Sequence, residues 1–321
     1  MKSHPKIYIK NDQGERVEAQ APVIISASRA TDIPAFYADW LFNRLEQGYV
    51  RWKNPFSGKD SYISFANTRF IVFWSKNPAP LIHYLPKLKE RGIKCYLQYT
   101  LNDYDSEALE PNVPDLYFRI ETFKQLVNIL GKGAVVWRFD PLIITDNIDI
   151  NTLICKVNNV GDKLSGFTEK IVFSFADIGI YKNVSKNLEN SGIKYREWDE
   201  KGMKEFAEKL AHINHERWNY ELATCAEKID LSEFGIAHNR CIDPELTARL
   251  TPDDAALQNY LYSAKCDSGQ RKHCGCILAK DIGAYNTCIH GCAYCYATRS
   301  NLHAAETHKR HLQQPFSDSL I

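Results

Sequence analysis

Residues 70–101 read FIVFWSKNPAPLIHYLPKLKERGIKCYLQYTL and contain one complete strand–helix–strand pattern. The apolar run Phe70–Ser75 is followed by Pro80–Arg91, in which apolar residues recur three and four positions apart, as on one face of a helix. Gly92 suits the end of that helix, and Lys94–Leu101 is a second apolar run. This order predicts two parallel strands joined by a crossover helix.

The same alternation extends over the first two thirds of the chain. Strands are predicted at Val23–Ala27, Phe70–Ser75, Lys94–Leu101, Ala134–Phe139, Lys170–Ala176 and Tyr220–Cys225. Helices are predicted at Pro34–Leu45, Pro80–Arg91, Leu116–Leu130, Asn151–Asn159 and Lys201–Trp218. Near-continuous apolar runs are typical of parallel strands that are buried on both faces. We therefore expect an α/β fold, with a six-stranded partial (β/α) barrel of the TIM type over residues 1–227.

Two segments depart from this alternation. Residues 49–66 contain two alternating runs separated by Gly58 and Lys59, which predicts an inserted hairpin. Strand patterns fade after residue 227, where cysteines and glycines become frequent. Residues 228–321 are therefore expected to form a cysteine-rich iron–sulfur region that docks on the barrel rim.

The composition limits the classes of function. The chain has 321 residues, with 40 Lys and Arg against 39 Asp and Glu, so its net charge does not indicate a nucleic-acid partner. The basic C-terminal stretch, Arg299–His311, is interpreted as a solvated helix. The start, MKSHPKIYIK, lacks the apolar core of a secretory signal, and no apolar run reaches the ~18 residues that span a bilayer. We expect a cytoplasmic protein without a membrane partner.

Polar side chains follow the predicted strands. In a (β/α) barrel the active site lies at the carboxyl ends of the strands, so these side chains predict a shared binding surface. Polar loops and helix N-caps, such as Asp32 and Asn77, explain any single one of them equally well. The residues singled out at this rim are Arg29, Gln98, Asn102, Arg138 and Ser174.

Ten cysteines are unevenly distributed along the chain, and eight of them lie in the last third. In a reducing compartment such a group indicates metal ligands more than disulfides. Cys288, Cys292 and Cys295 form a CxxxCxxC motif, with Tyr294 before the last cysteine and Gly291 inside the loop. Three thiolates can hold three irons of a 4Fe–4S cluster, which leaves the fourth iron open for chemistry.

This motif resembles the signature of the radical S-adenosylmethionine superfamily. The resemblance implies that Cys288, Cys292 and Cys295 bind the cluster and that Tyr294 contacts the adenine region of S-adenosylmethionine. It also implies reductive cleavage of that cofactor to a 5′-deoxyadenosyl radical, with an electron donor such as flavodoxin or ferredoxin. The substrate and the catalytic residues are left unidentified.

Most of the chain resembles a bacterial family, domain of unknown function 1848. The likeness rests on SASRATDIPAFY near the start, VFWSKNPAP, WRFDP and DIGAYNTC. The superfamily usually places its motif after the first strand, whereas here the motif comes last. The glycine- and glutamate-containing segment that many relatives use for the methionine amino group is not evident. Four strand-end residues are proposed to bind the cofactor in its place: Gln98, Asn102, Arg138 and Ser174.

A second cysteine group remains after this assignment. Four thiolates, from Cys225, Cys241, Cys274 and Cys276, could hold a second 4Fe–4S cluster or a zinc ion. Cys266 is an alternative ligand in a polar stretch, and free buried thiols are the alternative for Cys225 and Cys241.

Two other classes of function remain open. Cys274, Cys276, Cys292 and Cys295 could together hold structural zinc in a barrel-like binding protein, which would leave Cys288 without a role. An iron–sulfur protein that only transfers electrons is the other alternative.

Overall fold

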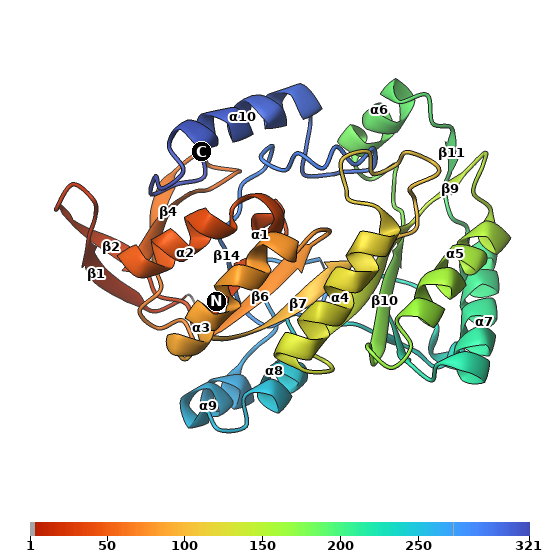
Figure 1. The fold of residues 1–321 in the computed structure, drawn as a ribbon, viewed down its shortest axis with the longest axis horizontal. Coiled ribbons are helices and arrows are strands. Elements are labelled where there is room, and N and C mark those ends of the chain that lie inside the picture. Colours follow the sequence, from red (N-terminus) through yellow and green to blue (C-terminus); the bar gives the residue numbers. More distant parts are fainter. Residues whose placement is uncertain (1–3, 272) are drawn as a thin grey trace.

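The computed structural model describes residues 4–271 and 273–321 and has an α/β fold around a central parallel sheet (Figure 1). The eight strands of this sheet follow in the order β13 (Ile236–His238), β12 (Glu221–Thr224), β10 (Lys170–Phe175), β8 (Val135–Leu142), β7 (Lys94–Thr100), β6 (Phe70–Ser75), β3 (Ile24–Ala27) and β14 (Lys280–Asp281). Every pair of neighbours in it is parallel.

The predicted α/β class is confirmed, and the predicted strand count was two too low. All six predicted strands belong to the sheet, and the two additional ones, β13 and β14, lie at its edges. They have three and two residues, too few to show a period in the sequence. Among the described residues the sheet ends at these two strands, which are not paired with each other.

The five predicted helical stretches are helical. They are α1 and α2 (Ile33–Phe36, Ala38–Gln47), η1 and α3 (Ala79–Tyr84, Leu85–Glu90), α4 (Leu116–Leu130), α5 (Ile150–Lys163) and α7 (Glu200–Arg217). Two of the stretches are divided. Pro86 stands in the first turn of α3, where its missing N–H is tolerated, and the preceding turn is a 3₁₀ helix.

The remaining helices and strands lie outside the predicted strand–helix alternation. The helices are α6 (Lys182–Asn190), η2 (Ser232–Phe234), α8 (Pro244–Leu250), α9 (Ala255–Ser263) and α10 (Asn301–Gln313). A second sheet has the order β1 (Lys6–Lys10), β2 (Arg16–Gln20), β5 (Asp60–Ser64) and β4 (Tyr49–Lys53), and β9 (Ile144–Thr145) pairs with β11 (Tyr195–Arg196). Residues 49–66, where a hairpin was predicted, form the antiparallel pair β4 and β5.

The C-terminal helix α10 is not solvated on all sides. Its His311 is 6% exposed and packs against Tyr37, with ring centroids 4.7 Å apart. The interpretation of this stretch as a solvated helix therefore holds for only part of its surface. None of the helices in the described ranges combines the length and the apolar character needed to cross a membrane.

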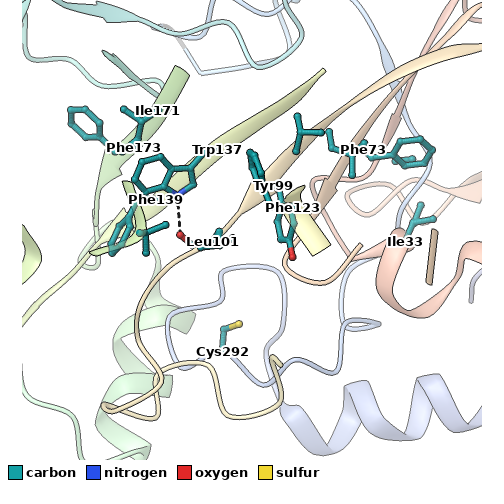
Figure 2. Packing of buried hydrophobic residues seen from close by; sticks show 14 of the residues in the cluster. Ile33, Phe73, Tyr99, Leu101, Phe123, Trp137, Phe139, Ile171, Phe173 and Cys292 are labelled. Carbon is teal, nitrogen blue, oxygen red and sulfur yellow. Dashed lines mark hydrogen bonds between the residues drawn. The ribbon is translucent and has the colours of Figure 1, made fainter. Parts of the chain in front are cut away.

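The two faces of the central sheet pack against different parts of the chain. Phe73, Leu97 and Trp137 belong to the large apolar cluster that includes the flanking helices (Figure 2). Their neighbours along the strands alternate to the other face, where Phe70, Val72 and Tyr96 pack against a smaller cluster. That second cluster contains six residues of the C-terminal segment: Cys241, Ile242, Leu257, Leu261, Cys276 and Ile277.

The cysteine-rich segment contacts the sheet near both the starts and the carboxyl ends of its strands. Helices α8 and α9 lie near the starts of the strands, because Asp254 pairs with Arg69, just before β6, at 3.0 Å. Helix α10 lies at the opposite end of the molecule (Figure 1). Residues 228–321 therefore contact the sheet near the starts of its strands as well as at the rim, where Cys241 contacts Gln98 and Arg138, and their docking as one region stays a prediction.

Candidate functional site

The CxxxCxxC loop lies at the carboxyl ends of the strands. Ala293 N–H donates to Leu109 O at 2.9 Å, in the loop that follows β7. Tyr296 Oη donates to the carbonyl of Arg29, just after β3, at 2.7 Å, and Asn112 N–H donates to His290 O at 3.1 Å. Figure 2 shows Cys292 on this loop, away from the strands and on the side of Leu101.

His290, inside the motif, is bound to a buried carboxylate. Asp32 caps helix α1 and also accepts hydrogen bonds from Ser75 Oγ at 2.7 Å and Lys76 N–H at 2.8 Å. Its Oδ2 lies 2.8 Å from His290 Nε2. Asp32 therefore joins the ends of β3 and β6 to the cysteine loop. From the sequence, Asp32 was equally well explained as a polar residue of the rim or as an N-cap, and its bond to the histidine between two cysteines was not foreseen.

Tyr294 reaches into a buried charged cluster. Its hydroxyl donates to Glu110, and it accepts from Lys76 Nζ at 2.9 Å and Asn102 Nδ2 at 3.0 Å. Glu110 also pairs with Lys76 at 2.7 Å and with Arg119 at 3.4 Å. Burial alone would raise the pKa of Glu110, but these two cations outweigh it and lower that pKa to about 2. The tyrosine hydroxyl therefore anchors the loop, and its predicted contact with adenine stays a prediction.

The three thiols of the motif differ in exposure. Cys292 is buried, whereas Cys288 and Cys295 are partly exposed. Burial raises the pKa of Cys288 and of Cys292, and the charge of Cys295 raises both further, so the three groups lie within electrostatic range of one another. Lys76 acts in the opposite direction on the pKa of Cys292.

The second cysteine group comes together on the face of the sheet opposite the large helical cluster. Cys225 follows β12, and its Sγ lies 3.3 Å from Cys241 Sγ. Cys276 affects the pKa of both Cys241 and Cys274, so its side chain lies near both. The four cysteines are therefore neighbours in the order Cys225, Cys241, Cys276 and Cys274, which is called the row below. Cys266, considered as an alternative ligand, is exposed, and its Sγ lies 3.9 Å from Gly275 O.

Three N–H groups donate to the inner sulfurs of this row. Cys241 Sγ accepts from Arg138 Nη1 at 3.1 Å and from Asn239 Nδ2 at 3.4 Å. Cys276 Sγ accepts from Ile242 N–H at 3.3 Å. The pKa of Cys241 lies well below its usual value, because Cys225 and Cys276 donate hydrogen bonds to its sulfur and Arg138 adds a positive charge.

Three of the four proposed cofactor residues lie beside this second group. Arg138 Nη1 donates to Gln98 Oε1 at 3.1 Å, and Gln98 Nε2 donates to Cys241 O at 3.0 Å. Asp140, which sequence reasoning missed as a site residue, accepts from Arg138 Nε at 3.1 Å and from Ser174 Oγ. The fourth residue, Asn102, binds Tyr294 and accepts from Asp140 N–H at 2.9 Å.

Arg29 keeps unused hydrogen-bonding capacity. Asp281 of β14 accepts from Arg29 N–H, Ser28 Oγ and Ser26 Oγ at 2.7–2.8 Å. The guanidinium of Arg29 lies over the ring of Trp74, 5.0 Å from its centroid, and its buried Nη2 has no hydrogen-bond partner in the described structure. Burial alone would lower the pKa of Arg29, but the nearby Cys276 and Asp281 outweigh it. The pKa is raised overall, so the guanidinium stays charged.

The donor sets can be tested against the groups they would hold. In residues 4–271 and 273–321, no three His, Cys, Asp or Glu side chains already surround a common position for one metal ion. A cubane places each thiolate on a different iron, so the separated sulfurs of Cys288, Cys292 and Cys295 fit a cluster better than a single ion. The second group offers four neighbouring cysteines, two of them with sulfurs 3.3 Å apart, and N–H donors suited to thiolate charge.

Comparison with known families gives one match. The model of the family described as Domain of unknown function (DUF1848) matches residues 24–297. The chain belongs to this family. The match runs from β3 through both cysteine groups, so the strand ends and the thiols are parts of one family domain. Searches among curated proteins and among solved structures found no match.

Proposed function

We propose that this DUF1848 protein is a radical S-adenosylmethionine enzyme that acts on a substrate yet to be identified. The observation that carries the proposal is a three-cysteine loop held at the carboxyl ends of parallel strands. When bound, the cluster supplies the electron for reductive cleavage of S-adenosylmethionine, which yields methionine and a 5′-deoxyadenosyl radical. In this proposal the sheet acts as an open partial barrel whose strand ends surround the reaction.

The chain's own groups keep the loop in position. Asp32 holds His290, which lies between the first two cysteines of the motif. Tyr294, between the last two cysteines, is held by Glu110, Lys76 and Asn102. Both parts of the loop are therefore fixed to the strand ends or to the loops that follow them. Such preorganisation matters because a small displacement of the reacting groups costs much of the rate. A 4Fe–4S cluster on Cys288, Cys292 and Cys295 would then face the strand ends.

Arg29 is the best available partner for the carboxylate of the cofactor's methionine. Gln98, Arg138 and Ser174 are already bonded to each other, to Asp140 or to Cys241. Arg29 Nη2 is buried and has no hydrogen-bond partner among residues 4–271 and 273–321, and Tyr296, next to Cys295, donates to the Arg29 carbonyl. A guanidinium and a carboxylate form a strong charged hydrogen bond, so Arg29 is proposed for this role ahead of Arg138.

Cofactor cleavage tests the proposal directly. Anaerobic, iron-loaded protein is mixed with S-adenosylmethionine and a strong one-electron reductant, and methionine and 5′-deoxyadenosine are measured. Slow release of both is expected without substrate. Cys288→Ala should abolish it, whereas Cys266→Ala, an exposed cysteine outside the motif, should not. Iron-loaded, reduced protein that neither cleaves the cofactor nor changes its electron paramagnetic resonance spectrum on adding it would refute the enzyme and favour the electron-transfer alternative.

A further inference from the structure

The second cysteine group lies in a setting that neutral, unliganded thiols do not require. Cys241 and Cys276 are 6% and 1% exposed, and their sulfurs accept N–H groups from Arg138, Asn239 and Ile242. A neutral thiol is a weak acceptor, whereas a thiolate gains from such donors and from a nearby cation. A buried thiolate without a partner is costly, and coordination to a metal offsets that cost.

The four cysteines of the second group come from three segments of the chain. Cys225 enters from the end of β12, Cys241 from the segment after β13, and Cys274 and Cys276 from the segment before β14. The end members, Cys225 and Cys274, are partly exposed, and the inner pair is buried. The 3.3 Å between Cys225 and Cys241 is near the separation of about 3.8 Å for two thiolates on one tetrahedral ion, given Zn–S bonds of about 2.3 Å.

We propose that Cys225, Cys241, Cys274 and Cys276 together bind a metal through four thiolates, as a centre separate from the CxxxCxxC loop. All ligand positions would come from the protein, so this centre has no open site and does not bind S-adenosylmethionine. Binding of zinc releases the thiol protons to solvent and requires no change of oxidation state, whereas a 4Fe–4S centre would assemble from two ferric and two ferrous ions supplied with four sulfides. The row closes around the metal by inward movement of the two end thiols.

Arg138 is a positioning residue for this centre. It contacts Cys241 directly and is held from the other side by Asp140 and Gln98. Outer groups of this kind hold a ligand's orientation and balance the charge of the site. This role takes Arg138 away from the cofactor role that the sequence suggested. The inference does not depend on the proposed function, because the second group needs no contribution from the three cysteines of the loop.

The test separates the two cysteine groups. The variant with Cys288→Ala, Cys292→Ala and Cys295→Ala leaves only the second group. The full-length variant is purified anaerobically and loaded either with zinc alone or with iron and sulfide, and metal per chain is measured. We expect about one zinc per chain in the first loading, or about four irons with four sulfides in the second. The loading that gives full occupancy identifies the kind of centre. Absence of bound metal in both arms overturns the proposal.

Further changes in that background locate the site. Cys241→Ser should lose the metal, and Cys274→Ser, at a less buried position, should lose it too if Cys241→Ser fails to fold. Cys266→Ser and Cys155→Ser, at exposed cysteines outside the row, should keep it. Arg138→Gln should weaken zinc or iron retention about 10- to 100-fold in a chelator competition, with partial recovery in Arg138→Lys. Equal loss from Cys266→Ser and Cys241→Ser, or a Cys225–Cys241 disulfide in anaerobic protein, would contradict the proposal.

Discussion

The two cysteine groups are held in different ways. In the CxxxCxxC loop the anchors are the residues between the ligands: His290 on Asp32 and Tyr294 on Glu110. In the second group the sulfurs themselves are contacted, by one another and by Arg138, Asn239 and Ile242. Within the described ranges, no two sulfurs of the first group are in hydrogen-bonding contact. The comparison indicates that the first group is an accessible set of ligands at the strand ends, whereas the second group is an enclosed set on the face of the sheet.

The largest expected effect removes the first group altogether. The triple variant with Cys288→Ala, Cys292→Ala and Cys295→Ala should lose all cofactor cleavage, because too few thiolates remain to hold the cluster. Its circular dichroism should match that of the unchanged protein, since the sheet does not depend on the loop. The same variant should keep the metal of the second group. Retained cleavage would contradict the assignment of cofactor chemistry to the first group alone.

Glu110→Gln should cause the next largest effect, about 3–5 kcal/mol in the free energy of unfolding, because Lys76 and Arg119 lose a buried partner. The folded-state pKa of Glu110 is lowered to about 2 from 4.5, so its contribution to stability is complete above pH 4.5 and is lost as the pH falls toward 2. Chemical denaturation between pH 2 and 7 measures both. A variant whose stability falls with acid as steeply as that of the unchanged protein would contradict this assignment.

Asp32→Asn tests the anchor of the first half of the motif. The change keeps the size of the side chain but weakens the bonds to His290, Ser75 and Lys76, and we expect a loss of about 1.5–3 kcal/mol. Iron bound by the first group should fall while metal in the second group is unchanged. The matched control is Asp115→Asn, an N-cap of α4 that does not contact the loop. A similar fall of both metals would mean that Asp32 supports the whole sheet and not the loop.

Tyr294→Phe should cause the smallest effect, about 1 kcal/mol, because Glu110 keeps its bonds to Lys76, Asn102 and Arg119. Thermal unfolding measures the loss of stability. Cofactor cleavage should decrease only modestly, since the ring stays and only the anchor of the hydroxyl is removed. Complete loss of cleavage with full iron content would instead show that the hydroxyl acts on the cofactor and that its role is more than anchoring.

Local patterns were sufficient for the main elements of the sheet. The predicted strand Phe70–Ser75 and helix Leu116–Leu130 have the bounds found in the structure. Their signals are periodic apolar residues and nearby glycines, which act over a few positions along the chain. β13 and β14 were missed because two or three residues carry no period, and they are strands only because a parallel neighbour is present.

The partners of the site residues lie outside the reach of local patterns. Asp32 and His290 are 258 positions apart, and Arg138 and Cys241 are 103 apart. Sequence spacing identified the cysteines because metal ligands on one loop must be close along the chain. It assigned Gln98, Arg138 and Ser174 to the cofactor because all three lie toward the carboxyl ends of predicted strands.

The sequence by itself therefore determined the α/β class, the CxxxCxxC motif and the rim that carries the polar residues. Only the tertiary structure decided which rim residue belongs to which cysteine group. The physical reason is that one sheet brings together side chains that are far apart along the chain: its strands follow in chain order except for β14, which comes from the C-terminal segment and pairs with β3. The neighbours that donate to a sulfur or hold a loop follow from that arrangement.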